Sequence, residues 1–320
     1  VQQITTRTYS GVFEHVVAFP ITKERTTMAE FRISLDECVD DEDECVVVPE
    51  GISVIGEEAF MNKRRLKEVI LPEGVTEIRA RAFSGCTNLV RVRIPSTVRV
   101  IEKEVFRGCW RLEEAIIPEG VTELPERVFI RCRRLAHVEL PSTLQSIGMQ
   151  CFRHCVDLKD VQLPTGITAI EDGVFQDCLS IDTLNLPESV SEIGNDAFGN
   201  CPELTRIKLP SDLIWIGQRA FKDCAKLSEI TLPEAVRSIE EETFMGCKSL
   251  QAVNLTDNVE FVDVRAFRNC PGIDADVVTN PDAEIAPDAF DPKPEPVPEE
   301  DAARAESEVP ATSDPSNAPV

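Results

Sequence analysis

Twelve cysteines and three histidines are the residues of this sequence that could carry covalent or metal chemistry. Nine of the cysteines, from Cys86 to Cys270, recur every 23 residues. In stacked repeats such cysteines lie one strand spacing apart with parallel side chains, which is a poor geometry for a disulfide. Zinc sites use closely paired ligands such as Cys-x-x-Cys, a spacing that the sequence does not contain. We therefore predict a column of buried free thiols that act as small apolar filler.

The other three cysteines need separate interpretations. Cys151 occupies a repeat position that is mostly Ala or Val, so we predict that it is part of the core. Cys38 and Cys45 flank an acidic stretch outside the regular column, and two alternatives stay open there: a disulfide or two free thiols. Free buried thiols favour a reducing compartment and hence the cytoplasm, with the cell surface as the alternative.

The histidines give no catalytic pattern. His137 and Glu139 alternate on one expected strand, where they could form an acid–base pair or a solvated surface pair, and the second is favoured. The sequence contains no nucleophile elbow, phosphate-binding loop or His-Glu-x-x-His motif. We therefore expect a protein that is not an enzyme and that needs no metal or cofactor.

The elements that position these residues follow from a 23-residue repeat. In the repeat that begins at Leu66, residues 66–71 alternate apolar and polar side chains, which predicts a short half-buried strand. Pro72 ends this strand, because proline cannot donate to a sheet ladder. Val75, Ile78 and Phe83 then face inward from a loose segment or short helical turn. Phenylalanine recurs at one invariant position: Phe60, Phe83, Phe106, Phe129, Phe152, Phe175, Phe198, Phe221, Phe244, Phe267 and Phe290.

One repeat cannot fold alone. Burial of its apolar side chains, about six in number, stabilises it by roughly 9–18 kcal/mol. Ordering a segment of this length costs on the order of 35 kcal/mol. Stacking must supply the difference, as in repeat proteins generally.

The motif LPxxVxxIGxxAFxxCxxL, which reads LPESVSEIGNDAFGNCPEL at 186–204, resembles the BspA-like class of leucine-rich repeats. The resemblance covers about residues 43–290. It implies a repeat solenoid with short parallel β-strands on one face and loops or short helical turns on the other. Arg79, Glu102 and Pro125 replace the usual Gly after Ile, which indicates that this position does not require positive φ. Family members include surface adhesins and intracellular proteins, so the resemblance implies binding rather than a particular partner.

Three regions are expected. Residues 1–42 form a non-repeat N-terminal flank whose apolar runs could be strands that cap the first repeat. Residues 43–290 form the solenoid of about ten repeats. Residues 291–320 are rich in Pro, Glu, Ala and Ser, a composition that cannot bury a core and predicts a disordered acidic tail.

The charge of the chain bounds its partners. The formal net charge is −24, which argues against nucleic acid and anionic membrane surfaces. No apolar run approaches the roughly 18 residues of a membrane helix. The charge is uneven, with 16 basic and 10 acidic residues between Lys63 and Arg134 but an acidic region beyond Pro281. Either the tail folds back on the basic repeats, or the two ends meet different partners.

The strand positions that point away from the core form the expected recognition surface, and protein is the expected partner. They vary freely while their neighbours are uniform. The candidate partner-binding residues on these strands are Arg91, Arg93, His137, Glu139, Arg206 and Lys208. Trp215 and Phe261 interrupt a column of mostly polar residues that we place on the turn edge of the array. They are either exposed hot spots or a patch on a less regular end. We predict a non-enzymatic protein-interaction scaffold, with a cell-surface adhesin or structural surface protein as the alternative. Neither partner identity nor oligomeric state follows from the sequence.

Overall fold

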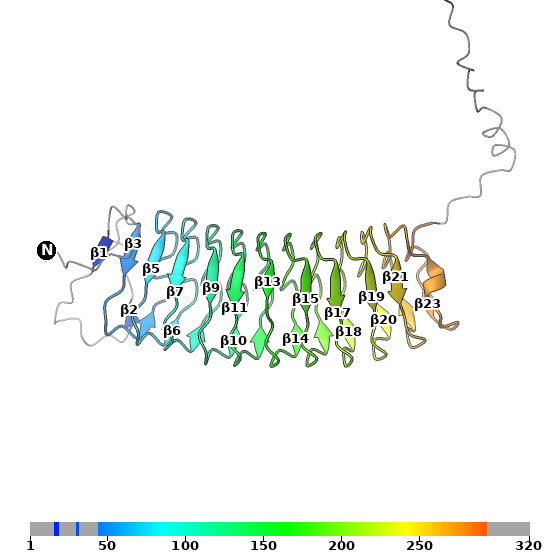
Figure 1. Ribbon diagram of the computed structural model, residues 1–320, viewed down its shortest axis with the longest axis horizontal. Helices are drawn as coiled ribbons and strands as arrows, with labels where there is room; N and C mark the ends of the chain where they lie inside the picture. The colour runs from blue at the N-terminus through cyan, green and yellow to red at the C-terminus, as the bar shows by residue number, and fades with distance from the viewer. Residues whose placement is uncertain (1–15, 19–29, 32–43, 293–320) are drawn as a thin grey trace, which may run out of the picture.

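A computed structural model describes residues 16–18, 30–31 and 44–292 of the chain. These residues form one elongated solenoid in which each 23-residue repeat makes one turn (Figure 1). A turn of the solenoid consists of a first strand, a Pro-containing turn, a second strand and a segment that carries the repeated Phe. His15, Cys38 and most of the flank and tail lie outside the described residues, so the Cys38–Cys45 alternatives stay open.

The first strands pair in parallel, each with the strand one repeat away, so that Glu68 lies opposite Arg91. Their middle residues are buried and their flanking residues point outward, as the alternation predicted. We call the outward side of these strands the first-strand face. The strands are β3 (Cys45–Val47), β5 (Glu68–Ile70), β7 (Arg91–Arg93), β9 (Glu114–Ile116), β11 (His137–Glu139), β13 (Asp160–Val161), β15 (Thr183–Asn185), β17 (Arg206–Lys208), β19 (Glu229–Thr231) and β21 (Ala252–Asn254).

A second set of parallel strands lies beyond the Pro-containing turn, where the sequence predicted a loose segment or a short helical turn. Each of these strands has two residues, too few for the polar–apolar alternation that identifies a strand. We call their outward side the second-strand face. The strands are β4 (Val54–Ile55), β6 (Glu77–Ile78), β8 (Val100–Ile101), β10 (Glu123–Leu124), β12 (Ser146–Ile147), β14 (Ala169–Ile170), β16 (Glu192–Ile193), β18 (Trp215–Ile216), β20 (Ser238–Ile239), β22 (Phe261–Val262) and β23 (Glu284–Ile285).

The repeated phenylalanines form one continuous stack in the core. Neighbouring rings have centroids 5.0–5.6 Å apart and planes within 12° of parallel. Ten of the rings, from Phe60 to Phe267, are fully buried, and Phe290 at the end is half-buried. Backbone hydrogen bonds also join neighbouring repeats here, since the Phe83 N–H donates to the Val105 carbonyl. The predicted core role of Phe is confirmed.

The cysteine column lies beside this stack, and its thiols are free and buried as predicted. Each thiol of the column also donates a hydrogen bond of 2.9–3.3 Å to the Phe carbonyl of the preceding repeat. Burial raises the pKa of these thiols, to about 12 at Cys86 and Cys224, so they stay protonated donors at neutral pH. The interpretation as apolar filler was therefore incomplete. Cys151 is buried in the core, which confirms that prediction.

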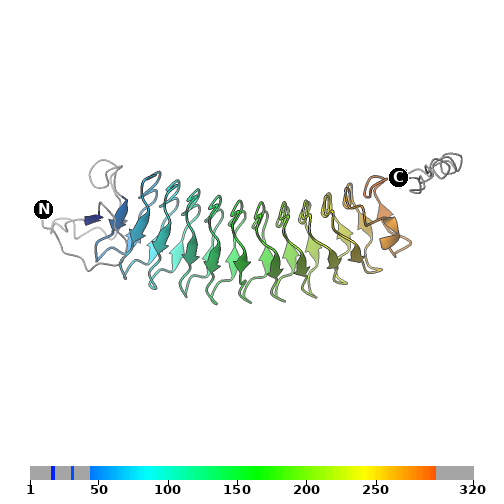
Figure 2. The ribbon, with the colours of Figure 1, turned by 45° about the horizontal axis from the view of Figure 1, so that its top comes forward.

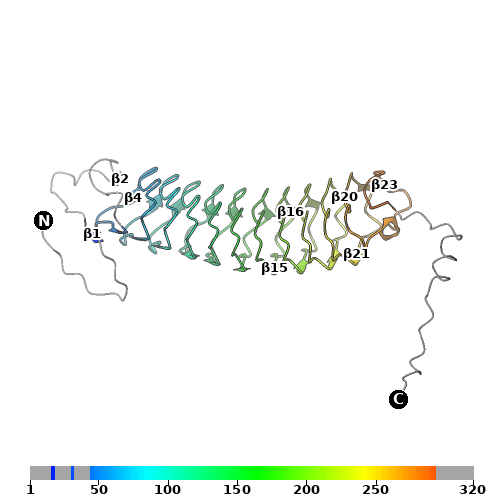
Figure 3. The same ribbon diagram turned by 90° about the horizontal axis from the view of Figure 1, so that it is seen from above.

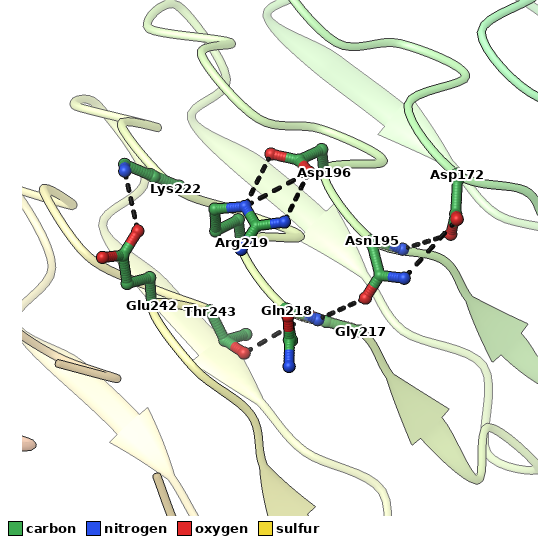
Figure 4. Close-up of polar contacts among 9 residues, drawn as sticks. All are labelled: Asp172, Asn195, Asp196, Gly217, Gln218, Arg219, Lys222, Glu242 and Thr243. Carbon is green, nitrogen blue, oxygen red and sulfur yellow. Dashed lines mark hydrogen bonds and ion pairs between the residues drawn. The ribbon is translucent and has the colours of Figure 1, made fainter. Parts of the chain in front are cut away.

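Side chains two residues before the repeated Phe also form pairs between neighbouring repeats (Figure 4). Arg219 has a φ of 57°, in the left-handed region, and its guanidinium binds the Asp196 carboxylate at 3.2 Å. Asp196 occupies the same repeat position and has a φ of 54°. This column carries alternating charges along much of the array: Glu58, Arg81, Glu104, Arg127, Asp196, Arg219, Glu242 and Arg265. Ion pairs between neighbouring repeats therefore form along a column whose backbone conformation non-glycine residues seldom adopt.

The glycines after Ile have a different role. Their φ is not positive, as the sequence indicated, and a Cβ at Gly217 would meet the backbone nitrogen of Asn195 at 2.7 Å. Close approach to the preceding repeat therefore favours glycine here. Beside it, the Gln218 N–H donates to the Asn195 side chain at 2.9 Å and the Asn195 N–H donates to Asp172 at 2.7 Å (Figure 4).

The two ends of the described solenoid are finished differently (Figure 3). At the N-terminal end, β1 (Val16–Ala18) pairs with β3 and β2 (Glu30–Phe31) pairs with β4, so both sets of strands are extended in the place predicted for a cap. At the C-terminal end the 3-10 helix η2 (Ala275–Val277) replaces the first strand of the last repeat. The boundaries of the three predicted regions stay a prediction.

Candidate binding surfaces

Arg91 and Arg93 point outward from β7 on the first-strand face, on either side of the buried Val92. Within residues 44–292, neither guanidinium forms an ion pair. Arg206 on β17 is likewise exposed and, in the part of the chain that the structure describes, has no carboxylate partner. Lys208 differs, because its Nζ lies 2.6 Å from the Glu188 carboxylate. Three of the four predicted positive charges are therefore available to an external anion.

Two apolar side chains flank Arg93 on this face. Ile70 lies opposite Arg93 in the strand register and is 39% exposed, and Ile116 on the next strand is 52% exposed. Exposed isoleucines beside unpaired guanidinium groups combine apolar area with charge, as protein interfaces do. The sequence signal for them was present, since both hold outward positions of the alternating pattern. We call Ile70, Arg91, Arg93 and Ile116 the N-terminal patch.

His137 and Glu139 lie side by side on β11, with His137 Nε2 3.2 Å from Glu139 Oε1. Both side chains are exposed. The geometry is that of the solvated surface pair which the sequence favoured. Glu139 lies opposite Ile116 in the register, so the pair borders the N-terminal patch.

Arg206 and Lys208 line a shallow depression of about 1030 Å³ on the first-strand face. Glu188, Glu229 and Glu234 line the same depression. Its charge is therefore mixed, unlike the pair of unpaired arginines at the N-terminal patch. The two basic pairs, which look alike in sequence, lie in different surroundings.

Trp215 and Phe261 are not on a turn edge, and that prediction was wrong. They lie in β18 and β22 on the second-strand face, both half-buried. Ser238 lies opposite Phe261 and separates the two aromatic positions, and Ile214 beside Trp215 is exposed. The second strands were not predicted, which is why these residues were misplaced. The arginines of β7 and β17 belong to the other set of strands, and Figure 3 shows the two sets along opposite edges of the solenoid, with β15 and β21 on one and β16 and β20 on the other.

Two other kinds of feature are absent from the described residues. Among them, no group of three or more His, Cys, Asp or Glu side chains is arranged to hold a metal ion. Within the same residues, no helix has the length and apolar character needed to cross a bilayer.

Comparisons with known proteins place this architecture. A comparison with proteins of curated function gives no match. A leucine-rich repeat protein from Eubacterium ventriosum is similar in structure, with 19% identity, a TM-score of 0.51 and coverage of 79% of this chain and 84% of that one. The pneumococcal vaccine antigen PcpA has 17% identity and a TM-score of 0.51, over 74% of this chain and 68% of that one. A leucine-rich cell-surface protein from Faecalibacterium prausnitzii has 26% identity and a TM-score of 0.44, over 72% and 77%.

The first two likenesses show the leucine-rich repeat fold. The model of the BspA-type leucine-rich repeat region matches residues 44–159 and 145–274, which is most of the solenoid. These matches agree with the motif seen at 186–204 and with the 23-residue period. The chain therefore belongs to the BspA-type leucine-rich repeat family.

Proposed function

We propose that this protein is a non-enzymatic scaffold that binds a protein partner through the first-strand face. One observation carries the proposal: the outward positions of the first strands differ from repeat to repeat, while the inward positions are nearly uniform. The fold of the family generally serves as a binding scaffold rather than as an enzyme. Because the outward positions do not have to fill the core, their side chains can be selected to bind a partner.

The N-terminal patch is the part of this face that best fits a partner. Arg91 and Arg93 present planar guanidinium groups, which bind carboxylates in two-pronged fashion. The flanking isoleucines add apolar area that loses water on contact. A partner segment that fits this patch carries acidic side chains for the arginines and apolar side chains for the isoleucines. The depression at Arg206 is a secondary candidate, because its own glutamates compensate its positive charge.

The test is affinity capture followed by a binding measurement. The intact chain and an Arg91→Ser/Arg93→Ser variant are used as parallel baits, and the bound proteins are identified by mass spectrometry. We expect a partner that binds the intact chain and is lost, together with most of the salt dependence of binding, in the variant.

A matched control removes two arginines from a different surface, Arg133→Ser/Arg134→Ser. It changes the net charge equally and should keep the partner. Equal loss of binding in both variants would show a general charge effect and contradict the assignment to the first-strand face. Loss in Trp215→Ala alone would move the interface to the second-strand face.

The location of this scaffold is a separate question. The cytoplasm was favoured only because of the free thiols, and no comparison supports that preference. Two similar structures are described as a cell-surface protein and a vaccine antigen. A surface adhesin or structural surface protein is therefore the alternative proposal. Labelling of an epitope on intact cells distinguishes the two locations, since only a surface protein is accessible.

A further inference from the structure

A second basic surface lies at the corner where the Phe-containing segment ends and the next first strand begins. Two successive repeats place Trp110 with Arg111, and Arg133 with Arg134, at this corner, and Arg131 lies beside them. All five side chains are exposed. We call these residues the arginine corner. It is the densest run of arginine in a chain whose net charge is −24.

The corner is organised before any ligand arrives. The Arg133 guanidinium lies over the Trp110 ring, 5.5 Å from its centroid. The Arg134 N–H donates to the Trp110 carbonyl at 3.2 Å, so the two repeats are joined by backbone. Arg111 donates to the Asn88 side chain at 3.3 Å, a neutral acceptor. Cation–π stacking of this kind fixes an arginine without neutralising its charge.

These charges have no carboxylate partner within the described solenoid. Among the described residues, Arg111, Arg131, Arg133 and Arg134 form no ion pair. The same positive charges affect the pKa of the neighbouring His154. Burial lowers its pKa, and the charges of Arg153, Arg131 and Arg133 lower it further against the opposing effect of Asp177. The surface therefore fits an anionic segment.

The C-terminal part of the same chain supplies such a segment. Beyond the described residues the sequence carries acidic side chains at Glu299, Glu300, Asp301, Glu306 and Glu308. It is preceded by a Pro-rich stretch, Pro292 to Pro298.

The point at which the chain leaves the solenoid favours this contact. The Asp291 carboxylate accepts a hydrogen bond of 3.0 Å from the Asn269 N–H. Asn269 holds the same repeat position as Arg131, six repeats away along the array. Neighbouring rings in this region lie 5.1–5.6 Å apart. Six repeats therefore separate Asn269 from Arg131 by about 30 Å. From Asp291 to residues 299–308 a chain of this length can span at most about 25–50 Å, a range that includes this separation.

We infer that the arginine corner binds the acidic segment 299–308 of the same chain. This contact goes beyond partner binding at the first-strand face, because it uses a different surface and an occupant within the chain. When the segment is bound, the corner is covered, and an external acidic partner must displace it.

The experiment measures proximity in the full chain. Trp215→Phe leaves Trp110 as the sole tryptophan, and Ser307→Cys provides an attachment site for an acceptor dye, with Cys38→Ser removing a cysteine outside the described residues. The column thiols are buried with raised pKa values and react slowly. We expect strong energy transfer from Trp110 at low salt that falls severalfold in high salt. It should not depend on protein concentration.

Neutralising the segment by Glu299→Gln, Glu300→Gln and Asp301→Asn should lower transfer to the high-salt level. Arg133→Ser/Arg134→Ser should do the same, whereas Arg91→Ser/Arg93→Ser removes equal charge and should leave transfer unchanged. Transfer that is already at the high-salt level in the starting chain overturns the proposal. So does an equal loss in both arginine pairs, or transfer that rises with protein concentration, which would indicate binding between copies. None of these results bears on partner binding by the N-terminal patch.

Discussion

The inward and outward columns of the solenoid obey different rules. Inward positions repeat almost unchanged, with a stacked Phe and a thiol that donates to the preceding repeat. Outward positions on the first strands change from Glu68 to Arg91 and on to His137. Figure 2 shows that successive turns have nearly the same backbone course throughout. One set of residues therefore maintains the stacking, while the other is free to define surfaces.

The largest expected effect is a loss of stability at high pH, which arises at the inward cysteine column. Burial raises the pKa of the column thiols, to about 12 at Cys86, while an unfolded thiol ionises near 8.5. Stability is therefore fully present below the unfolded pKa and is lost as pH rises toward the folded pKa. Each buried thiol lowers stability by roughly 1.4 kcal/mol per pH unit in that window. Denaturant unfolding at pH 7 and pH 10 measures the loss, and an equal midpoint at both values contradicts the buried thiols.

Removing one ring should have the next largest effect. Phe175 is fully buried between Phe152 and Phe198 at centroid distances of 5.6 Å on both sides. Phe175→Ala should destabilise the fold by about 3–5 kcal/mol, since it leaves a cavity. Phe290→Ala at the half-buried end of the stack should cost clearly less. Unfolding curves of the two variants check this order, and equal losses would show that the stack is not the core.

A smaller effect is expected where repeats approach closely. Gly217→Ala places a Cβ 2.7 Å from the Asn195 nitrogen, so the neighbouring repeat must shift. We expect a loss of about 1–3 kcal/mol, as for other overpacked sites. Gly51→Ala is the contrasting control for space, because its Cβ would meet no atom within 4 Å, although its positive φ brings a cost of its own. Thermal unfolding of Gly217→Ala with no change in midpoint contradicts the close approach.

The smallest effect on stability should come from the outward columns. Arg91→Ser/Arg93→Ser removes two exposed side chains that form no ion pair within residues 44–292, so the free energy of unfolding should change by less than about 0.5 kcal/mol per site. Partner affinity should fall nonetheless. A variant that unfolds more easily would show that these arginines take part in the fold rather than in recognition.

Periodicity explains what could be predicted. The column of Phe83 and the column of Cys86 stand out because each recurs at one spacing, and the strand around Val69 stands out by alternation. The second strands span two residues each and leave no such signal, so Trp215 was placed on a turn edge and not on the second-strand face. The thiol hydrogen bonds depend on a carbonyl of another repeat, which no single row shows.

The arginine corner escaped the sequence analysis for a similar reason. Arg111 and Arg134 hold one repeat position, Trp110 and Arg133 another, and Arg131 a third. Arg131, Arg133 and Arg134 are neighbours in the sequence, but only stacking adds Trp110 and Arg111 of the preceding repeat to the same surface. A basic residue count over the region had indicated an excess of charge but not where it gathers.

The uniform spacing of the ring stack fixes the distances between surfaces along the solenoid. Each ring adds 5.0–5.6 Å, so the distance between the N-terminal patch and the depression at Arg206 is fixed as a whole number of such steps. Duplication or loss of 23 codons in the gene would lengthen or shorten that distance by one step. It would leave both surfaces otherwise unchanged. Two epitopes on a partner could thus be matched by counting repeats, without remaking either contact.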